Sequence, residues 1–438
     1  MTFAKLGLTA PLLQTLDTLG YTTPTPVQQQ VIPPVLAGRD VLAAAPTGTG
    51  KTAAFALPLL QQLATTTTAT AAGSVRILVL VPTRELAEQV MTACTTYGAG
   101  LGQSTYAVYG GVKLGPQINR LQQGVDILVA TPGRLLDLFT RNAVGLRDVT
   151  TLVLDEADRM LDLGFAADLD VIFQALPRTR QTLLFSATFA PSINELAGRR
   201  LRKPLRIDAA PRQTSAATVR QWVVPVDKRK KSELFLFMRR DRNWQQTLVF
   251  VRTRQGCEEL LARLHSKDIP AATLHGDRTQ AERQAALAAF KAGTVEVLIA
   301  TDVAARGIDI AGLPLVVNYD LPDQPEDYIH RIGRTGRAGL PGTAVSLVCA
   351  DEAPRLAAIE QRLKKQLARD EEPGFEPQHR VPATAPGSLP RPRPALRTNK
   401  AGGRGNWVDE FAPAGKGTGN SRHRNGPAGT RKTAGRGR

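Results

Sequence analysis

Short apolar runs recur along the first half of the chain. Each is followed by a polar or glycine-containing turn and then by a segment of helical periodicity. The runs that we interpret as buried strands are residues 41–45, 77–81, 127–130, 152–154 and 182–185. Continuous apolar strands that alternate with helices are typical of a parallel sheet covered on both faces. Because such sheets bind ligands at the carboxyl ends of their strands, the loops after these runs are candidate sites.

The same alternation returns in the second half of the chain. The second set of predicted strands is 247–251, 271–274, 295–300, 315–318 and 343–348, with helical segments between them such as 280–291. The pattern predicts two α/β domains of similar plan, at residues 1–207 and 219–369. Between them, residues 208–218 are rich in Ala, Pro, Gln, Thr and Ser, which indicates a short flexible linker.

The amino-acid composition changes at about residue 370, where apolar periodicity ends and Pro, Gly, Arg, Asn and Thr dominate. Residues 380–438 contain 13 Lys/Arg and 2 acidic residues, a net charge of +11. Too few apolar groups are present to offset the entropy of ordering, so we expect residues 370–438 to form a disordered basic tail. Such a tail either contacts phosphates or only keeps the protein in solution, and its charge density favours phosphate contact.

The whole chain of 438 residues has a formal charge of +17 and a pI near 10.2. This balance favours a polyanionic partner, either nucleic acid or an anionic membrane surface, over a protein that is merely basic. No stretch approaches the roughly 18 apolar residues of a spanning helix, which weakens the membrane alternative. Cys94, Cys257 and Cys349 lack CxxC spacing, so we expect reduced thiols and a cytoplasmic protein without a zinc site.

A glycine-rich loop follows the first predicted strand. It reads Pro-Thr-Gly-Thr-Gly-Lys-Thr and leads into a helical pattern at Ala53. A strand, such a loop and a helix form a phosphate cradle, in which backbone N–H groups and the helix N-terminus face the phosphates. Lys51 would neutralise the β- and γ-phosphates, and Thr52 would bind Mg²⁺. The residues that we assign to the nucleotide here are Ala45 (where the usual pattern has Gly), Gly48, Thr49, Gly50, Lys51 and Thr52.

An acidic segment, Asp155-Glu156-Ala157-Asp158, ends the predicted strand 152–154. An unpaired carboxylate at the end of a buried strand is costly, and a metal ion removes that cost. Asp155 therefore suits Mg²⁺, held through water, and Glu156 suits activation of an attacking water. An acidic loop on a solvated surface is the alternative, which the preceding phosphate loop makes the weaker one.

Taken in order, these motifs closely resemble those of the DEAD-box RNA helicases of superfamily 2, and their texture resembles the bacterial RhlE-like subgroup. The resemblance covers about residues 1–368 and implies two tandem RecA-like domains, each a mostly parallel sheet with helices on both faces. It also implies that Phe3 stacks on adenine and that Gln28 contacts its polar edge. Phe3 could equally be a core residue.

The resemblance assigns further roles to loops in both domains. Gly307 and Asp309 would face the nucleotide, and Arg334 and Arg337 would be the arginine fingers that complete the catalytic set Lys51, Asp155 and Glu156. Residues implied to couple hydrolysis to strand separation are Asp158, Ser186, Thr188 and His330. Residues implied to hold the RNA backbone are Pro82, Thr83, Arg84, Gly111, Thr131, Pro132, Gly133, Arg134, Arg252, Thr253, Gly276, Thr301 and Arg306.

The resemblance thus implies an enzyme that uses ATP and Mg²⁺ to separate short RNA duplexes by closing two domains, with little sequence preference. One alternative is a translocase on duplex DNA, which the glutamine motif and the DEAD spelling disfavour. Another is an RNA clamp with a vestigial ATPase, which the intact Lys51, Glu156, Arg334 and Arg337 disfavour. The sequence indicates no membrane partner and identifies neither the RNA nor any protein partner.

Overall fold

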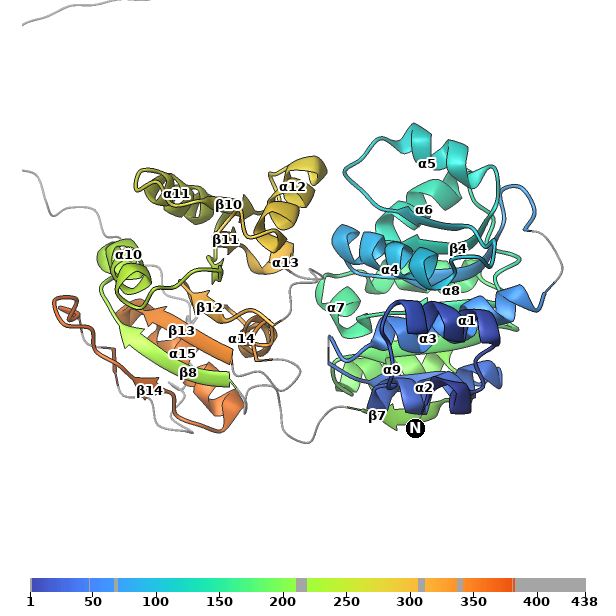
Figure 1. The fold of residues 1–438 in the computed structure, drawn as a ribbon, viewed down its shortest axis with the longest axis horizontal. Coiled ribbons are helices and arrows are strands. Elements are labelled where there is room, and N and C mark those ends of the chain that lie inside the picture. The colour runs from blue at the N-terminus through green and yellow to red at the C-terminus, as the bar shows by residue number, and fades with distance from the viewer. Residues whose placement is uncertain are drawn as a thin grey trace, which may run out of the picture. The chain divides into compact units, whose positions relative to one another are not determined.

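Two parallel sheets of seven strands form the framework of the computed structural model (Figure 1). The structure describes residues 2–46, 48–66, 70–209, 219–305, 312–336, 342–379 and 381–382. The first sheet has the strand order β3-β4-β2-β5-β6-β1-β7, and the second has the order β10-β11-β9-β12-β13-β8-β14. This is the architecture of two tandem RecA-like domains that the sequence predicts.

The first sheet is formed by residues 41–208, and all of its paired strands run parallel. Its strands are β1 (Val41–Ala44), β2 (Val75–Leu80), β3 (Thr105–Val108), β4 (Val125–Ala130), β5 (Thr151–Leu154), β6 (Gln181–Ser186) and β7 (Leu205–Asp208). Its helices are α1 (Ala10–Thr18), α2 (Pro26–Leu36), α3 (Lys51–Ala64), α4 (Arg84–Tyr97), α5 (Leu114–Leu121), α6 (Pro132–Thr140), α7 (Ala157–Asp162), α8 (Ala166–Ala175) and α9 (Pro191–Arg200), preceded by the 3-10 helix η1 (Phe3–Leu6).

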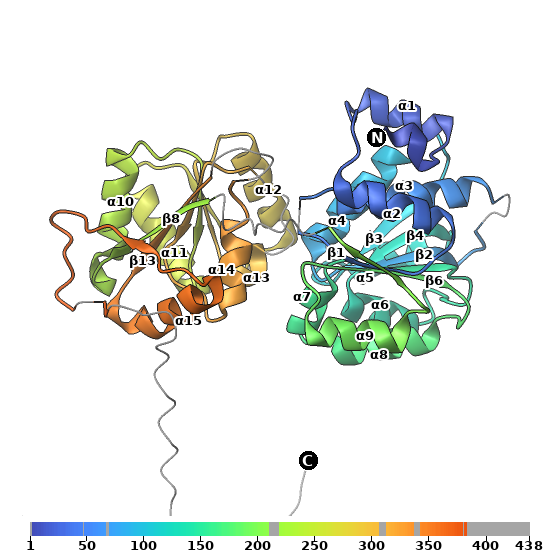
Figure 2. The same ribbon diagram turned by 90° about the horizontal axis from the view of Figure 1, so that it is seen from below.

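Helices cover both faces of this sheet (Figure 2), and an apolar core lies between the sheet and each helical layer. Helices α1 to α4 bury residues such as Phe55 and Val90 on one face. Helices α5 to α9 bury residues such as Met160 and Phe173 on the other. Since β1, β5 and β6 are buried along their whole length, their central side chains are apolar on both faces, which explains the continuous runs in the sequence.

The second sheet repeats this plan. Its strands are β8 (Val219–Pro225), β9 (Thr247–Phe250), β10 (Ala271–Leu274), β11 (Val297–Ala300), β12 (Leu315–Asn318), β13 (Gly342–Val348) and β14 (Ala368–Arg369). Its helices are α10 (Lys231–Asp241), α11 (Arg254–His265), α12 (Gln280–Lys291), α13 (Asp302–Ala305), α14 (Pro325–Ile332) and α15 (Ala353–Leu363), with the 3-10 helices η3 (Lys228–Lys230) and η4 (Ala350–Glu352). Helices α10 and α11 cover one face, and α12 to α15 cover the other.

Four strands were absent from the sequence prediction: β3, β7, β8 and β14. Strands β3, β7 and β14 lie at sheet edges, where one side of the strand is open and polar residues replace the apolar run. Strand β7 reads Leu-Arg-Ile-Asp, so Asp208 belongs to the first sheet and not to the linker. The other expected linker positions, 210–218, lie outside the described residues.

The basic tail begins later than expected, because residues 370–379 pack on the second domain. Phe375 lies against Phe237, with their ring centroids 5.4 Å apart, and Arg242 forms ion pairs with Asp370 and Glu372. Asp227 accepts backbone N–H groups from residues 378 and 379. A single aromatic among charged residues carries no periodicity, which is why the sequence did not reveal this anchor. Residues 383–438 lie outside the described residues.

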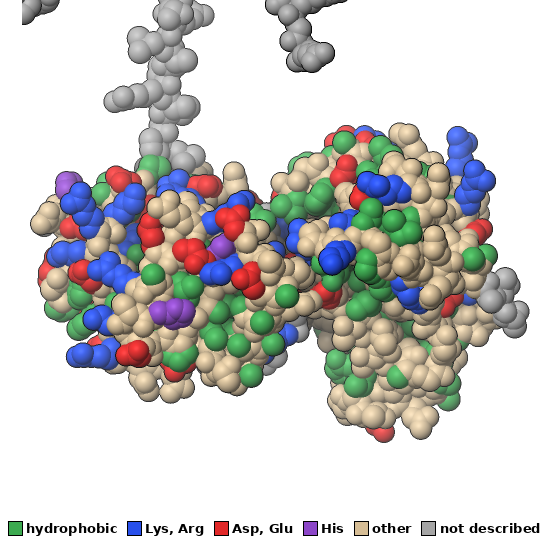
Figure 3. Space-filling model, turned by 90° about the horizontal axis from the view of Figure 1, so that it is seen from above, with side chains coloured by type: hydrophobic (Ala, Val, Ile, Leu, Met, Phe, Trp, Pro, Cys, Tyr) green, Lys and Arg blue, Asp and Glu red, His purple; other side chains and the backbone are tan. Residues whose placement is uncertain are grey.

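Basic side chains are scattered among acidic and uncharged ones on the face that Figure 3 shows. The charge of the described residues therefore forms no continuous basic sheet on this face. None of the described helices is long and apolar enough to cross a membrane.

Candidate functional site

Each half of the first sheet ends in a different set of loops. The loops after β1, β5 and β6, which are neighbours in the sheet, carry the phosphate loop, the Asp155 segment and Ser186. The loops after β2, β3 and β4, in the other half, carry the segments expected to hold RNA. Because all these strands are parallel, both sets lie at the carboxyl edge of one sheet, side by side.

A pocket of about 450 Å³ lies over the β1, β5 and β6 half. Its walls come from the N-terminal segment, the phosphate loop, α4, the Asp155 segment and α14's C-terminal side. The residues that line it are Phe3, Tyr21, Thr23, Thr25, Gln28, Gly48, Thr49, Gly50, Lys51, Thr52, Ala53, Leu86, Gln89, Ala93, Tyr97, Asp155, Glu156 and Arg334. Phe3 belongs to the first apolar core and also lines the pocket, so the two roles considered for it are compatible. Ala45 is buried in that core, directly before the phosphate loop.

Gln28 connects the N-terminal segment to the phosphate loop. Its Oε1 accepts the N–H of Thr25 at 2.9 Å, and its Nε2 donates to the carbonyl of Gly50 at 3.2 Å. Since an amide has two N–H donors and two acceptor lone pairs, one of each remains for a ligand. Gly50 has a φ of 90°, and a Cβ there would lie 2.4 Å from Gln28 Nε2, so only glycine fits.

Lys51 and Asp155 face each other at the floor of the pocket. Lys51 Nζ lies 3.7 Å from Asp155 Oδ1 and has no hydrogen-bond partner among the described residues, although the residue is only 5% exposed. A buried ammonium without hydrogen bonds is costly, which fits a site that receives phosphate oxygens. Burial raises the pKa of Asp155 to about 6, against the opposing charge of Lys51. A carboxylate held in this way gains from a second cation, so the pair fits Mg²⁺ bound beside a phosphate.

The Asp155 segment contacts the loop after β6. Glu156 has a φ of 54°, a left-handed conformation that turns the chain between β5 and α7. One oxygen of Asp158 accepts the N–H of Ala187 at 3.0 Å. Ser186 Oγ donates to the carbonyl of Thr188 at 2.8 Å and accepts its N–H at 3.3 Å. The segments expected to couple hydrolysis to RNA are therefore in direct contact.

Two arginines at the end of α14 and just beyond it have different surroundings. Arg331 is 2% exposed and binds Asp302 through two contacts of 2.6 Å, while also donating to Asn318. Arg334 instead lines the nucleotide pocket. His330 lies beside Asp327, its Nδ1 3.9 Å from a carboxylate oxygen. Arg331 is thus bound within its own domain, and among the described residues Arg334 is the arginine that lines the pocket.

Three loops of the first domain bring the expected RNA residues together. Thr83 caps α4 by accepting the N–H of Leu86 at 3.3 Å, which directs Arg84 towards the loop after β3. Gly111 has a φ of 80°, and a Cβ there would lie 2.0 Å from Arg84 Nη1. Arg134 donates to Gln117 at 2.8 Å. The residues after β2 and β4 at this edge are Pro82, Thr83, Arg84, Thr131, Pro132, Gly133 and Arg134.

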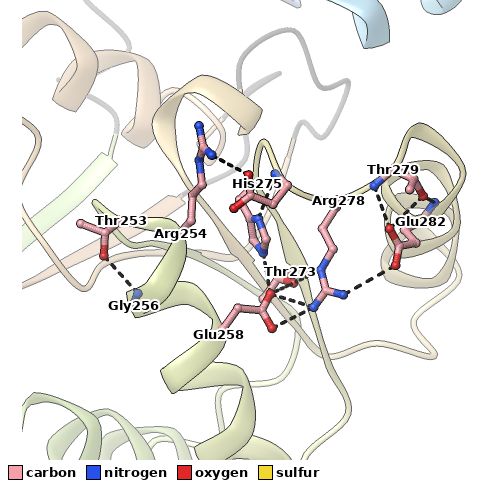
Figure 4. A network of polar contacts seen from close by, with 10 residues as sticks. Thr253, Arg254, Gly256, Glu258, Thr273, His275, Arg278, Thr279 and Glu282 are labelled. Atoms are coloured by element: carbon pink, nitrogen blue, oxygen red, sulfur yellow. Dashed lines mark hydrogen bonds and ion pairs between the residues drawn. The ribbon is translucent and has the colours of Figure 1, made fainter. Parts of the chain in front are cut away.

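The second domain places its expected RNA residues in the same way. Arg252 and Thr253 follow β9, Gly276 follows β10, and Thr301 follows β11, and these strands are neighbours. Thr253 caps α11 through the N–H of Gly256 at 3.0 Å (Figure 4). Arg254 pairs with Asp277 across this edge, at 2.5 Å.

A polar network supports the loop after β10 from below (Figure 4). Glu258 of α11 accepts hydrogen bonds from Thr273 at 3.0 Å and from Arg278 at 2.7 and 2.9 Å. His275 Nε2 lies 2.5 Å from the same carboxylate. Burial would raise the pKa of Glu258, but the hydrogen bonds from His275 and Thr273 and the charge of Arg278 outweigh it and lower that pKa. The network holds the loop that carries Gly276.

Two further contacts were not anticipated from the sequence. Glu85, 5% exposed, pairs with Arg283 at 2.9 Å, and Arg159 pairs with Asp327 at 3.0 Å. Each pair joins residues more than 160 positions apart in the sequence. Such distant pairs have no local sequence signal, so only the tertiary structure reveals them.

Some pocket residues could have been found from the sequence. Thr25 and Gln28 form a reciprocal capping box at the start of α2, and the Thr-x-x-Gln spacing is its signature. Tyr21 and Tyr97 lie together with ring centroids 6.2 Å apart, a contact that no local pattern indicates. The expected residues Arg306, Gly307, Asp309 and Arg337 lie outside the described residues.

Comparisons with known protein families match both domains. Residues 25–196 match the family model "DEAD/DEAH box helicase", and residues 229–339 match "Helicase conserved C-terminal domain". A DEAD-box ATP-dependent RNA helicase CshA of Bacillus subtilis is 40% identical over 376 residues, which cover 86% of this chain and 75% of that protein. CshA of Bacillus cereus is 41% identical over 375 residues, 86% of this chain and 70% of that protein. These names give no support to the RhlE-like subgroup expected from the sequence.

Solved structures agree with this result. Saccharomyces cerevisiae Dbp5 bound to RNA and ADP BeF3 matches with a TM-score of 0.73 and 30% identity, over 84% of this chain and 95% of that one. The DEAD-box helicase Mss116 bound to single-stranded RNA and UDP-BeF matches with a TM-score of 0.76 and 29% identity, over 86% of this chain and 81% of that one.

Proposed function

This chain belongs to the DEAD-box family of ATP-dependent RNA helicases, and from that premise we propose how its own residues unwind short RNA duplexes. The observation that carries the proposal is the division of each sheet's carboxyl edge. In the first domain, one half bears the pocket with Lys51 and Asp155, and the other bears Arg84 and Gly111. Nucleotide and RNA would therefore occupy adjacent loops of one rigid sheet, so each could change the geometry offered to the other.

Phe3 and Gln28 would bind the adenine, and residues 48–52 would bind the phosphates. The donor and acceptor that Gln28 retains match the polar edge of a purine, and the aromatic ring offers a stacking face. The unpartnered Nζ of Lys51 would bind the β- and γ-phosphates. Ala45 and Thr49 would shape the loop, and Gly307 and Asp309 would contact the nucleotide from the second domain.

Thr52 and Asp155 would hold Mg²⁺. The ion supplies charge neutralisation at the phosphates when it is bound. The burial of Asp155 supports this assignment, because the raised pKa marks a carboxylate whose charge is poorly compensated by Lys51 alone.

Glu156 would orient the attacking water and accept its proton. Arg334, with Arg337, would stabilise the negative charge that develops on the γ-phosphate, a contribution of about 10³–10⁵ in rate for arginine fingers. The position of Arg334 in the pocket wall supports this role. Since this arginine comes from the second domain, hydrolysis would require both domains.

RNA would bind through its sugar-phosphate backbone. On the first domain Pro82, Thr83, Arg84, Gly111, Thr131, Pro132, Gly133 and Arg134 would hold it, and on the second Arg252, Thr253, Gly276, Thr301 and Arg306. Backbone contact carries little sequence information, so we expect little sequence preference. Asp158, Ser186, Thr188 and His330 would transmit nucleotide state to these loops, and the Asp158 hydrogen bond to Ala187 supports this path.

The basic tail would add RNA affinity by tethering the domains near their substrate. A cytoplasmic location completes the proposal and is supported by the three free cysteines, all buried.

The Glu156→Gln variant tests the chemistry. We expect it to bind ATP and RNA as the wild type does and to lose ATP turnover by at least about a hundredfold, because the amide cannot accept the proton. Turnover would be measured with and without single-stranded RNA, and with matched DNA. Wild-type turnover in the variant would refute the assignment of Glu156, whereas stimulation by DNA alone would refute RNA as the substrate.

A further inference from the structure

The edge of the first sheet opposite the pocket also carries charge. Strand β1 pairs in parallel with β6 (Val41 with Leu183) and with β7 (Val41 with Leu205), so the amino ends of these three strands lie together. The segments that lead into them include the C-terminal end of α9 (green in Figure 1). We call their basic residues the amino-edge patch: Arg39, Arg178, Arg180, Arg199, Arg200, Arg202 and Lys203.

One buried carboxylate fastens the three segments together. Asp40 is 7% exposed, and its two oxygens accept the N–H of Thr182 at 2.8 Å and the N–H of Arg202 at 2.6 Å. Gln181 Nε2 donates to the carbonyl of Arg39 at 2.8 Å. The amino-edge patch therefore stands on a rigid base, although its members are up to 164 residues apart in sequence (39 to 203).

The side chains of three members of the patch, Arg180, Arg200 and Arg202, are also held in place. The guanidiniums of Arg180 and Arg200 lie 5.3 and 4.8 Å from the centre of the Phe173 ring. Arg180 Nη1 donates to the carbonyl of Pro177 at 2.5 Å, and Arg202 Nη2 donates to the carbonyl of Arg178. The Nε atoms of Arg180 and Arg200 are buried, and in the part of the chain that the structure describes they have no hydrogen-bond partner. Ordered guanidiniums lose less entropy when they bind an anion than free ones do.

The carboxylates nearby do not balance this charge. Asp40 is occupied by backbone N–H groups, while Asp170 pairs with Arg200 and Glu195 pairs with Arg199. The side chains of Arg39, Arg178 and Lys203 are exposed, and in the described part of the chain they form no ion pair.

The basic groups also repel one another. Burial lowers the pKa of Arg180, and the charges of Arg202 and Arg200 add to this effect against the opposing charge of Asp40. Helix α9 explains two of the cations, because basic residues in a last turn interact favourably with the helix dipole. It does not explain Arg39, Arg178 or Lys203, which lie in loops. A cluster that repels itself gains free energy when phosphates bind to it.

We propose that the amino-edge patch binds the sugar-phosphate backbone of RNA that extends beyond the helicase site, as a second RNA surface on the first domain. The patch and the phosphate loop lie at opposite ends of β1, about 13 Å apart for a four-residue strand. A short RNA bound to the carboxyl-edge loops would not reach it. A long RNA that curves around the domain would contact both the patch and the carboxyl-edge loops. The patch would then hold the RNA while the helicase site releases it.

The test compares long and short RNA on the full chain. The variant is R39Q/R178Q/K203Q, and the control is K228Q/R229Q/K267Q, which removes the same charge from exposed positions of the second domain. Affinity would be measured for single strands of about 8 and about 40 nucleotides over a range of salt, because each phosphate contact contributes about 0.7 to the slope of log K against log salt. ATP turnover stimulated by the short strand reports the helicase site separately.

We expect the variant to bind the long strand with a salt slope lower by up to about 2, and about tenfold more weakly at low salt. Its affinity for the short strand and its turnover with that strand should match the wild type. An unchanged salt slope for the long strand would refute the proposal and would favour an acidic protein as the ligand of the patch. Equal losses for both strands, or an equal loss in the control, would refute it too. If the triple variant does not fold, the single variant Arg178→Gln is tested in its place, with an expected change in the salt slope for the long strand of about 0.7.

Discussion

At the residue scale, the site depends on two glycines at which a Cβ atom would collide with a neighbouring side chain. Gly50 and Gly111 both adopt a positive φ, and both lie against a side chain that the proposed ligands require, Gln28 and Arg84. A Cβ at position 111 would overlap the guanidinium of Arg84. Glycine is thus needed at both positions for its backbone conformation and for the space it leaves. Gln28 and Arg84 can occupy their positions because neither glycine has a Cβ atom.

Gly111→Ala should weaken RNA binding and leave ATP binding intact. The left-handed backbone costs about 1–2 kcal/mol for alanine, and the Cβ displaces Arg84 as well. We expect the KM for single-stranded RNA in the ATPase assay to rise by about tenfold. Gly115→Ala is the matched control, because its Cβ would meet open space in α5, and it should leave that KM unchanged. Equal KM values for the two variants would contradict the steric role of Gly111.

At the scale of elements, buried charges join helices of the second domain to the ends of its strands. Lys231, 2% exposed, donates to Glu352 of η4 at 2.7 Å and to Asp320, after β12, at 3.1 Å. Asp320 also accepts the N–H of Arg252 at 3.1 Å, and its carbonyl accepts from Arg331 at 2.6 Å. The network therefore connects α10, η4 and α14 to a loop expected to contact RNA.

This network should make the second domain sensitive to acid. Burial would raise the pKa of Asp320, but Lys231 and the Arg252 N–H outweigh it and lower that pKa. A carboxyl group with a lowered folded-state pKa stabilises the fold above its unfolded-state pKa, near 3.9, and loses that contribution as the pH falls through the folded-state value. Asp320→Asn should therefore be less stable than wild type at pH 7, by about 2 kcal/mol for a lost hydrogen bond to a charged group, because Lys231 keeps its ion pair with Glu352.

The difference between wild type and Asp320→Asn should shrink below about pH 4. Trp222 and Trp244 lie in the second domain, and the third tryptophan, Trp407, lies in the tail, so fluorescence during urea unfolding follows this domain. Asp323→Asn is the control, since Asp323 forms an exposed ion pair with Arg355. A difference that is constant from pH 7 to pH 3 would show that the charge of Asp320 does not contribute.

At the scale of the whole molecule, the two sheets share one plan, and the loops expected to bind RNA follow corresponding strands in each. In each, three neighbouring strands end in the loops expected to bind RNA: β3-β4-β2 in the first and β10-β11-β9 in the second. ATP and RNA that favour the same arrangement of the domains must each tighten the binding of the other by the same factor. The chain beyond residue 369 then acts in two parts, an anchor on the second domain and a basic tail.

Two truncations separate the anchor from the tail. Ending the chain after residue 382 removes 12 Lys/Arg and 2 acidic residues, and we expect weaker RNA binding with a shallower salt dependence but unchanged stability. Ending it after residue 369 also removes Phe375 and the partners of Arg242. That should lower the unfolding free energy of the second domain by about 2 kcal/mol, measured by tryptophan fluorescence in urea. Equal stability of the two truncations would show that residues 370–382 are no anchor.

The sequence alone determined the chemistry that depends on a few consecutive residues. The phosphate loop and the Asp155 segment each need only a strand, a turn and a helix in succession, and these are local properties that periodicity and residue type encode. The two-domain plan follows for the same reason, since fully buried strands must be apolar throughout.

The tertiary structure decided which of these segments are neighbours. Strand order placed Asp155 opposite Lys51 and gathered the amino-edge patch around Asp40. Packing of helices from the two halves of the chain gave Glu85 and Arg159 their distant partners. It also added the edge strands and the anchor of Phe375, whose mixed composition is stable only against a completed domain. Contacts between residues over a hundred positions apart depend on packing, and no local pattern encodes packing.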